Sequence, residues 1–195
     1  MKKINPLAVI LGLLVAVALY LVGQYNLLVA ADEQVKEAWS NVEAQYQRRL
    51  DLIPNLVNTV KGYAAHEQNV LLQVVEARNK ALQTKVEIND PASIEKFQQA
   101  QNEVSSALSR LLLLVENYPD LKANQNFLTL QAQLEGTENR IATARRKYNE
   151  AVRRYNTLIR RFPTNIIAQK FGFEPKVGFK ATTGAEQAPE VNFEN

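Results

Sequence analysis

The sequence predicts an all-α protein: an up-and-down antiparallel helical bundle preceded by one N-terminal transmembrane helix. One apolar run near the N-terminus is long enough to cross a bilayer. Three later segments repeat apolar residues with the period of amphipathic or coiled-coil helices, and no segment shows a competing strand pattern. Turns of a few residues join these segments, so consecutive helices are expected to pack antiparallel.

The N-terminal apolar run is LAVILGLLVAVALYLVG, and no charged residue occurs from Ile4 until Asp32. A helix over residues 7–29 would be about 34 Å long, which exceeds the hydrocarbon thickness of about 30 Å. Lys2 and Lys3 precede this run. The positive-inside rule therefore predicts a single-pass protein with a cytoplasmic N-terminus and an extracytoplasmic body.

The alternative for this segment is a cleaved signal peptide, because small residues precede two cleavage positions, after Ala18 and after Ala31. A cut after Ala18 would leave the apolar stretch LYLVG on the mature protein. The second position lies far from the apolar centre. An uncleaved anchor is therefore preferred.

The first amphipathic segment follows a heptad register, and INDP at 88–91 ends it. Asp90 is expected to cap the second helix, with Pro91 at its first position. The register of the first segment is Val35, Trp39, Val42, Tyr46, Arg49, Ile53, Leu56, Val60, Tyr63, Glu67, Val70, Val74, Ala77 and Ala81.

The second helix ends at NYPD (117–120), and a third helix follows with the strongest periodicity in the chain. FPTN and the short apolar helix IIAQKFGF come next, and the remainder is expected to be an extended tail that touches the body through Phe179, Val191 and Phe193. Three parts are therefore expected: a cytoplasmic stub and anchor (1–31), a helical bundle (32–173) and the tail (174–195). The third helix carries a seam of Phe127, Leu134, Ile141, Tyr148, Tyr155 and Phe162 at intervals of seven.

Three residues of the first amphipathic segment do not suit a buried helix face: Arg49, Pro54 and Glu67. A proline inside a helix costs about 3 kcal/mol. We therefore predict that the helix is kinked or broken at Pro54, with Asp51 as N-cap of the segment that follows. A break there would make the bundle four-helical.

Two interpretations of these polar positions remain open. Arg49 and Glu67 either pair with facing helices and fix their register, or Pro54 opens the backbone and Arg49 lines a cleft that receives a partner's carboxylate or peptide. The candidate interaction or register residues are Arg49, Asp51, Pro54, Asn55 and Glu67.

The sequence lacks the motifs of common catalytic sites. His66 is the only histidine, there is no cysteine, and Val70 stands where a zinc-protease helix needs a second histidine. No glycine-rich phosphate loop or GxSxG motif is present. We therefore predict no enzyme activity, no catalytic residue, no metal, no cofactor and no small-molecule substrate.

The third helix also carries a basic ridge. Its neighbouring tyrosines fall on the apolar seam, and an extracytoplasmic body would meet no nucleic acid, so nucleic-acid binding is not expected. If this helix rose from the membrane, Arg140 would lie about 25 Å up its axis, beyond a Debye length of roughly 8 to 10 Å. No role at the bilayer is then expected for the ridge, which comprises Arg140, Arg146, Lys147, Arg153, Arg154, Arg160 and Arg161.

Several long stretches of the sequence resemble the LemA family of bacterial proteins. They are AWSNVEAQYQRRLDLIPNLVNTVKGYAAHE (38–67), EARNKA (76–81), residues 116–163 and the terminal PEVNF. The resemblance implies a single-pass protein of the cytoplasmic membrane with a bromodomain-like up-and-down bundle, and it supplies no catalytic residues. It also implies an association with membrane metallopeptidases in some members and with magnetosome membranes in one branch.

These observations favour a non-enzymatic, membrane-tethered interaction or assembly module with a protein partner. The first alternative is a self-assembling structural protein that shapes membrane, with the seam of the third helix extended between copies. The others are an accessory partner of a membrane metallopeptidase and a hydrolase that uses helix-borne carboxylates.

Overall fold

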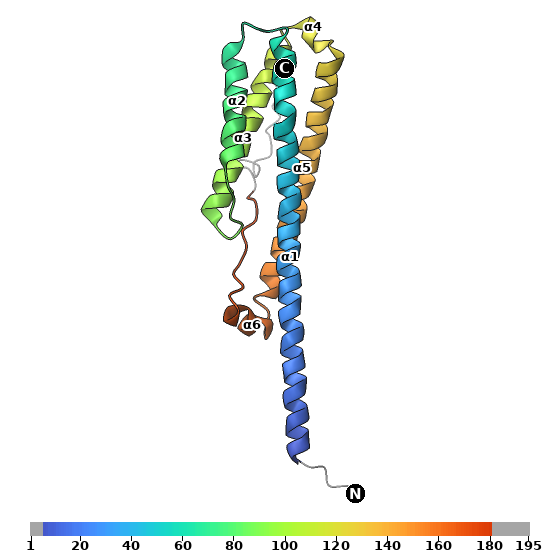
Figure 1. The fold of residues 1–195 in the computed structure, drawn as a ribbon, viewed down its shortest axis with the longest axis vertical. Coiled ribbons are helices and arrows are strands. Elements are labelled where there is room, and N and C mark those ends of the chain that lie inside the picture. The colour runs from blue at the N-terminus through green and yellow to red at the C-terminus, as the bar shows by residue number, and fades with distance from the viewer. Residues whose placement is uncertain (1–5, 181–195) are drawn as a thin grey trace, which may run out of the picture.

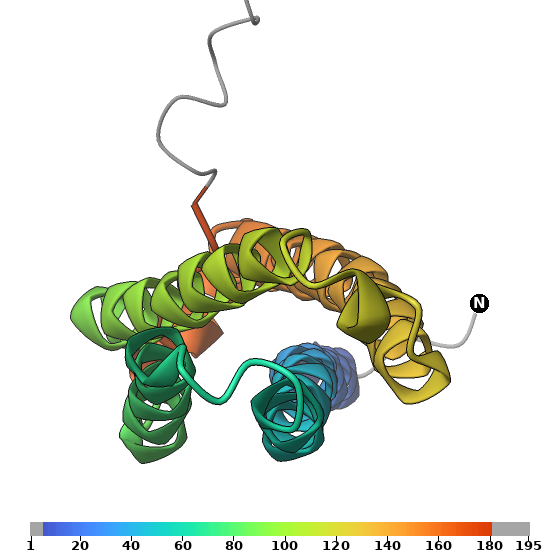
Figure 2. The same cartoon turned by 90° about the horizontal axis from the view of Figure 1, so that it is seen from above.

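The computed structural model describes residues 6–180, which contain six helices and no strand. The long helices run alternately up and down, beginning with α1, whose N-terminal part projects beyond the bundle (Figure 1). Seen from above, α3 and α5 form one layer and α1 and α2 the other (Figure 2). The prediction of an all-α, up-and-down bundle is confirmed. The helices are α1 (Pro6–Lys61), α2 (Gln68–Gln83), α3 (Pro91–Val115), α4 (Pro119–Lys122), α5 (Gln125–Leu158) and α6 (Thr164–Lys170).

The N-terminal part of α1 is apolar and exposed. Among the described residues, α1 is the one helix that is long and apolar enough to cross a membrane, and its most apolar window is 0% buried in the protein. The same helix then enters the bundle, where Leu28 and Val35 are fully buried. The candidate membrane segment and the first bundle helix are thus one continuous helix.

A kink or a break was predicted at Pro54, and the break is wrong, because α1 continues through this residue to Lys61. The chain instead turns between α1 and α2, at residues 62–67. The Val60 carbonyl accepts from the N–H groups of both Tyr63 and Ala64, at 3.0 and 2.9 Å, which closes the helix beside Gly62. The turn gives the four-helix arrangement of α1, α2, α3 and α5.

The core consists of two hydrophobic clusters stacked along the bundle. The cluster far from the projecting end contains Leu50 of α1 and Leu134 of α5, whereas the cluster near that end contains Tyr46 and Ile141. A polar layer separates them, in which Arg49, Gln101 and Thr137 are at most 3% exposed. The heptad register thus predicted the buried face of α1, including its arginine.

The seam of α5 is buried from Phe127 to Tyr155, as expected. Phe162 is an exception at 82% exposed, because α5 ends at Leu158 and the seam ends with it. The direction of α5 also differs from the expectation. It begins at the end of the bundle far from the projecting part of α1 and descends towards it (Figure 1), so the C-terminal end of α5 lies near the candidate membrane segment. Arg160 and Arg161 follow this end directly in the chain.

The segment after α6 packs along α5. Tyr148 and Tyr155 donate their hydroxyl protons to the carbonyls of Val177 and Glu174, at 2.8 and 3.0 Å. Phe179 is buried in the core cluster near the projecting end, which confirms the expected contact of the tail. The other two expected contacts, Val191 and Phe193, lie outside the described residues.

Candidate functional site

Arg49 is the largest fully buried side chain, at 1% exposed. Its Nη1 donates to Ser105 Oγ at 2.9 Å and to Glu138 Oε1 at 2.8 Å. Its Nη2 donates to the Gln101 carbonyl at 3.1 Å and also to the Gln101 side chain. The guanidinium also lies over the Tyr46 ring, with Cζ 5.1 Å from the centroid. Arg49 thereby joins α1 to α3 and α5.

These contacts bear on the two interpretations of Arg49. Glu138 already provides the opposing carboxylate, and its side chain is 48% exposed, so that carboxylate remains hydrated. The Nε atom has no partner among the described residues, but it is buried rather than directed into an open cleft. The geometry favours a register role for Arg49, which stays a prediction.

Pro54 is exposed on α1, and its missing N–H affects the carbonyl group of Leu50, one turn earlier in the helix. Because proline has no N–H, the Leu50 carbonyl lacks its usual intrahelical donor. Arg78 of α2 takes that place, donating from Nε to the Leu50 oxygen at 2.8 Å. The proline therefore frees an acceptor that ties α2 to α1, which gives a physical reason why the helix tolerates it.

The other predicted site residues form no hydrogen bond or ion pair with Arg49, whose side-chain partners among the described residues are Gln101, Ser105 and Glu138. Asp51 is exposed inside α1, where it accepts from Gln47 Nε2 at 2.7 Å, so its predicted role as an N-cap is wrong. Asn55 is exposed. Glu67 precedes α2 and accepts from the Tyr118 hydroxyl at 3.1 Å, which raises the pKa of Tyr118. The five candidates thus form no common site.

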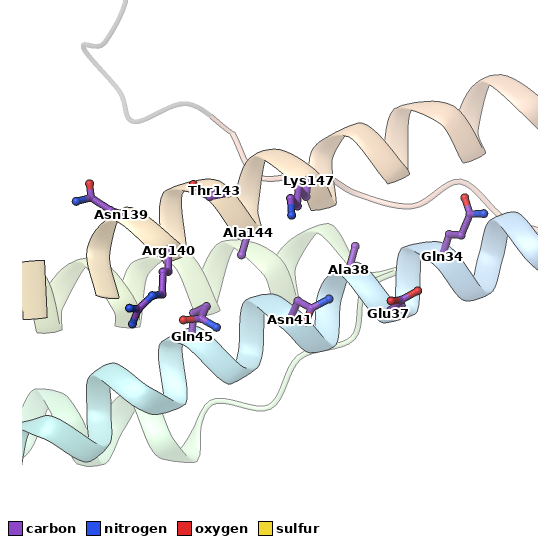
Figure 3. A pocket seen from close by; sticks show the side chains of 10 residues that line it. All are labelled: Gln34, Glu37, Ala38, Asn41, Gln45, Asn139, Arg140, Thr143, Ala144 and Lys147. Carbon is purple, nitrogen blue, oxygen red and sulfur yellow. The ribbon is translucent and has the colours of Figure 1, made fainter. Parts of the chain in front are cut away.

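An open groove between α1 and α5 was not predicted from the sequence. It has a volume of about 600 Å³. Arg140 and Ala144 of α5 point towards Gln45 and Asn41 of α1, whereas Asn139 points away (Figure 3). The lining, which defines the α1–α5 groove, is Gln34, Glu37, Ala38, Asn41, Gln45, Asn139, Arg140, Thr143, Ala144 and Lys147.

In the described structure, the polar side chains on the two walls of the α1–α5 groove do not bond to one another. Among the described residues, no hydrogen bond or ion pair joins an α1 side chain of the groove to an α5 side chain of the groove. The Oε1 atom of Gln45 is buried and has no hydrogen-bond partner there. Unpaired buried polar atoms are uncommon in native proteins. The groove therefore offers unused hydrogen-bonding capacity.

A second groove of similar size, about 520 Å³, lies between α2 and α3 and behaves differently. Lys80 of α2 forms an ion pair with Glu103 of α3 at 2.7 Å. Arg110 of α3 donates to Gln73 Oε1 of α2 at 2.9 Å. Side chains of the protein itself thus bridge this groove and use its polar atoms.

The groove's composition suits the binding of a polypeptide. Its amide side chains can both donate to and accept from a peptide backbone. Arg140 and Lys147 outnumber the single acid Glu37, so an acidic segment is favoured over a basic one. Within residues 6–180 no group of His, Asp or Glu is arranged to hold a metal ion. His66 is exposed beyond the end of α1.

The comparisons with known proteins agree on one family. The model of the LemA family matches residues 38–193. Protein LemA of Metamycoplasma hominis is 25% identical over 161 residues, covering 83% of this chain and 71% of the relative. Magnetosome protein MamQ 2 of Paramagnetospirillum magneticum is 28% identical, covering 77% of this chain and 62% of the relative. MamQ of Magnetospirillum gryphiswaldense is 26% identical, covering 83% and 66%.

Proposed function

Because the chain belongs to the LemA family, we propose that it is a non-enzymatic, membrane-anchored interaction module that receives a segment of a partner protein in the α1–α5 groove. The names of its relatives describe LemA and magnetosome proteins and assign no reaction. The continuous helix α1 would hold the groove at a fixed height above the bilayer. Confinement to one membrane raises the effective concentration of a partner in that membrane.

The proposed topology has the N-terminus in the cytoplasm and the bundle outside it, at the cytoplasmic membrane. Lys2 and Lys3 support this orientation through the positive-inside rule. The division into an anchor, a bundle and a tail at residues 31 and 173 is part of the same proposal.

The observation that carries the proposal is the contrast between the two grooves. The α2–α3 groove is closed by its own ion pair and hydrogen bond. The α1–α5 groove has amides and two cations that no side chain across the groove engages, together with the buried, unpartnered oxygen of Gln45. A bound polypeptide with acidic side chains would satisfy these groups. The occupant we propose is therefore an extended, acidic segment of another membrane-associated protein.

Site-specific photocrosslinking in intact membranes tests this function. A photoreactive residue replaces exposed Asn41 in the α1–α5 groove, and the matched control replaces exposed Asn102 in the α2–α3 groove. We expect a discrete adduct with one partner protein from Asn41 and none from Asn102. Reversing the charges of the groove with Arg140→Glu and Lys147→Glu should abolish that adduct, because the partner segment would then be repelled.

Two outcomes would contradict the proposal. The first is an identical set of adducts from both positions, which would indicate random collision. The second is an adduct of the chain with itself alone, which would favour self-assembly. Extension of the α5 seam between copies, the alternative form of self-assembly considered from the sequence, is disfavoured because the seam is buried inside the bundle up to Tyr155. An adduct with a membrane metallopeptidase would specify the partner within the proposed function.

A further inference from the structure

The end of the bundle nearest the projecting part of α1 exposes apolar and basic side chains together. Phe162, Ile166 and Phe171 are 82%, 57% and 58% exposed, respectively. Arg160, Arg161 and Lys170 are exposed beside them in the chain. Elsewhere on the described bundle, exposed large apolar residues such as Leu72 and Leu113 lie far apart in the chain. Such a concentration of exposed apolar surface indicates a site that contacts a membrane or another protein.

Helix α6 is fixed at a defined height on α1. Thr164 Oγ1 donates to Gln24 Oε1 at 2.8 Å. The Phe171 ring lies 4.9 Å from the Tyr25 ring, measured between centroids. The buried side chains of α6 are Thr164, Ile167 and Ala168. Figure 1 shows α6 beside α1 where the helix leaves the bundle. The exposed residues of α6 are thus held at the level of Gln24 and Tyr25.

A bilayer that covers the exposed apolar part of α1 would have its edge near that level. The exposed apolar helix before Gln24 begins at Leu7, which gives a length of about 26 Å at 1.5 Å per residue. This is slightly less than the hydrocarbon thickness of about 30 Å. A membrane that covers this helix therefore reaches at least to Gln24. Tyr25 and Phe171 then lie where aromatic residues gather in membrane proteins.

We propose that this end of the bundle is a second membrane contact, in which apolar side chains enter the headgroup boundary and cations bind the phosphates of anionic phospholipids. The cations lie within a Debye length of the surface in this arrangement. None of them forms an ion pair with another described residue. The membrane-contact patch consists of Arg160, Arg161, Phe162, Ile166, Lys170 and Phe171.

The acids at this end of the bundle leave the patch basic. Asp32 is paired with Lys36 and Lys176, and Glu33 with Lys36. Glu174 is an exposed acid close to the patch in the chain. Residues 160–174 thus carry three cations and one carboxylate, and none of these four groups forms an ion pair with another described residue. Two attachment points, the transmembrane part of α1 and the patch, would fix the bundle's tilt and its rotation about α1.

The contact rests on the membrane anchoring and is independent of the α1–α5 groove. Its test uses the full chain in vesicles that contain brominated phosphatidylcholine, which quenches nearby tryptophan. The one native tryptophan, Trp39, is 6% exposed within the bundle and supplies the background. Phe162→Trp reports the patch, and Leu113→Trp is the matched control, because Leu113 is 71% exposed near the far end of α3.

We expect brominated lipid to reduce the emission of Phe162→Trp and to leave Leu113→Trp at the background of the wild-type chain. Emission from Phe162→Trp should also shift to shorter wavelength in vesicles. Equal quenching of the two variants would overturn the proposal. So would a Phe162→Trp signal protected from both brominated lipid and aqueous iodide, because protein would then cover the patch.

A second arm tests the cations. In vesicles with phosphatidylglycerol, Phe162→Trp should be quenched more than in purely zwitterionic vesicles. Replacing Arg160, Arg161 and Lys170 by glutamine should remove this difference, whereas the control set Arg48→Gln, Lys61→Gln and Lys122→Gln, at exposed cations outside the patch and the α1–α5 groove, should keep it. A difference that survives the patch substitutions would overturn the assignment of lipid binding to these cations. The same charge substitutions are also made in the chain that keeps Phe162, where Trp39 is the only tryptophan. Unchanged emission of Trp39 in these variants verifies that they fold.

Discussion

At the level of single residues, Arg49 is the polar link between the two halves of the core. Replacing it with methionine keeps an unbranched apolar stem but removes every donor to Gln101, Ser105 and Glu138. Gln101 is 3% exposed and would lose a buried partner, whereas the carboxylate of Glu138 can hydrate. We therefore expect Arg49→Met to lower the free energy of unfolding by about 1–3 kcal/mol.

Denaturant unfolding of the full chain in detergent, followed by circular dichroism, measures this effect. The control is Glu138→Gln, which should cost less than about 1 kcal/mol because this partner is half exposed. A neutral Arg49→Met variant would refute the polar link. The combination of Arg49→Met with Gln101→Leu should recover part of the loss, because no buried amide then lacks a partner.

Pro54 and Arg78 should be energetically coupled through the Leu50 carbonyl. In the native chain, Arg78→Met removes the side-chain donor to this oxygen and should cost about 1–2 kcal/mol. In a Pro54→Ala background the backbone N–H of residue 54 can bond to Leu50, so the same change should cost less. A double-mutant cycle measures the coupling, expected to be about 1 kcal/mol. Additive effects would contradict the explanation of the proline.

Asp90 and Asp51 allow the stability contribution of a helix N-cap to be compared with that of a position inside a helix. Asp90 accepts from the Ala92 N–H at 2.9 Å at the start of α3, so Asp90→Ala should cost about 1 kcal/mol. Asp51 lies exposed inside α1, so Asp51→Ala should change the stability by less than about 0.5 kcal/mol. Thermal unfolding of the two variants compares them directly. A cost for Asp51→Ala equal to that for Asp90→Ala would indicate a helix start that the structure lacks.

At the level of elements, the segment after α6 depends on two buried phenols. Burial raises the pKa of Tyr148 and of Tyr155 to about 12. The unfolded value is about 10, so the folded state binds these protons more tightly. Their contribution to stability is complete below about pH 10 and is lost as the pH rises towards 12. Both hydroxyls must be protonated to donate to the segment.

We therefore expect this segment to detach in alkali before the bundle unfolds. A fluorophore attached at Lys180→Cys should report its release, while far-ultraviolet circular dichroism reports the helices. A Tyr148→Phe, Tyr155→Phe variant should hold the segment more weakly at neutral pH and should lose most of the alkaline transition. Loss of helix and segment at the same pH would contradict this order of events.

The same segment is also held by the ion pair between Lys176 and Asp32, which acid should break. Burial alone would raise the pKa of Asp32, but hydrogen bonds and charges from Lys176 and Lys36 outweigh it and hold the pKa below its ordinary value. This stabilisation is present above the ordinary pKa of about 3.8 and is lost as the pH falls through the lower folded value. Lys176→Met should therefore raise the pKa of Asp32, which NMR titration of its carboxyl carbon can measure.

Sequence periodicity predicted the faces of the helices better than their ends. Val35, Trp39, Val42 and Ile53 are buried as the heptad register required. The register continued past Gly62 because turn residues there happen to keep the same spacing, so the end of α1 was missed. At Pro54 the intrinsic cost of proline predicted a break, but a donor from α2 compensates the lost hydrogen bond, and α2 is remote in sequence.

The α1–α5 groove could not be predicted from the sequence. What distinguishes it is that, in the described part of the chain, side chains of α1 and α5 do not bond to one another across it. Gln45 and Arg140 resemble ordinary exposed polar positions of amphipathic helices. Only the three-dimensional comparison with the bridged α2–α3 groove distinguishes them.

The membrane-contact patch was missed for a different reason. The turn at residues 62–67 adds a helix to the count and thereby reverses the direction expected for α5.

At the level of the whole molecule, both proposed contacts depend on the continuity of α1 from the bilayer to the far end of the bundle. This continuity sets the height of the α1–α5 groove, and it brings α6 to the membrane surface. A hinge near Gly23 would let the bundle lie down on the bilayer, and neither the groove nor the patch would then keep its place.

Pulsed electron paramagnetic resonance measures this continuity most directly. The chain has no native cysteine, so Val15→Cys and Asn58→Cys, both exposed on α1, accept two spin labels alone. For the full chain in lipid nanodiscs we expect one narrow distance distribution near 65 Å, the length of about 43 helical residues at 1.5 Å each. A broad distribution, or one centred at a much shorter distance, would show a hinge in α1 and contradict the continuous helix on which both contacts depend.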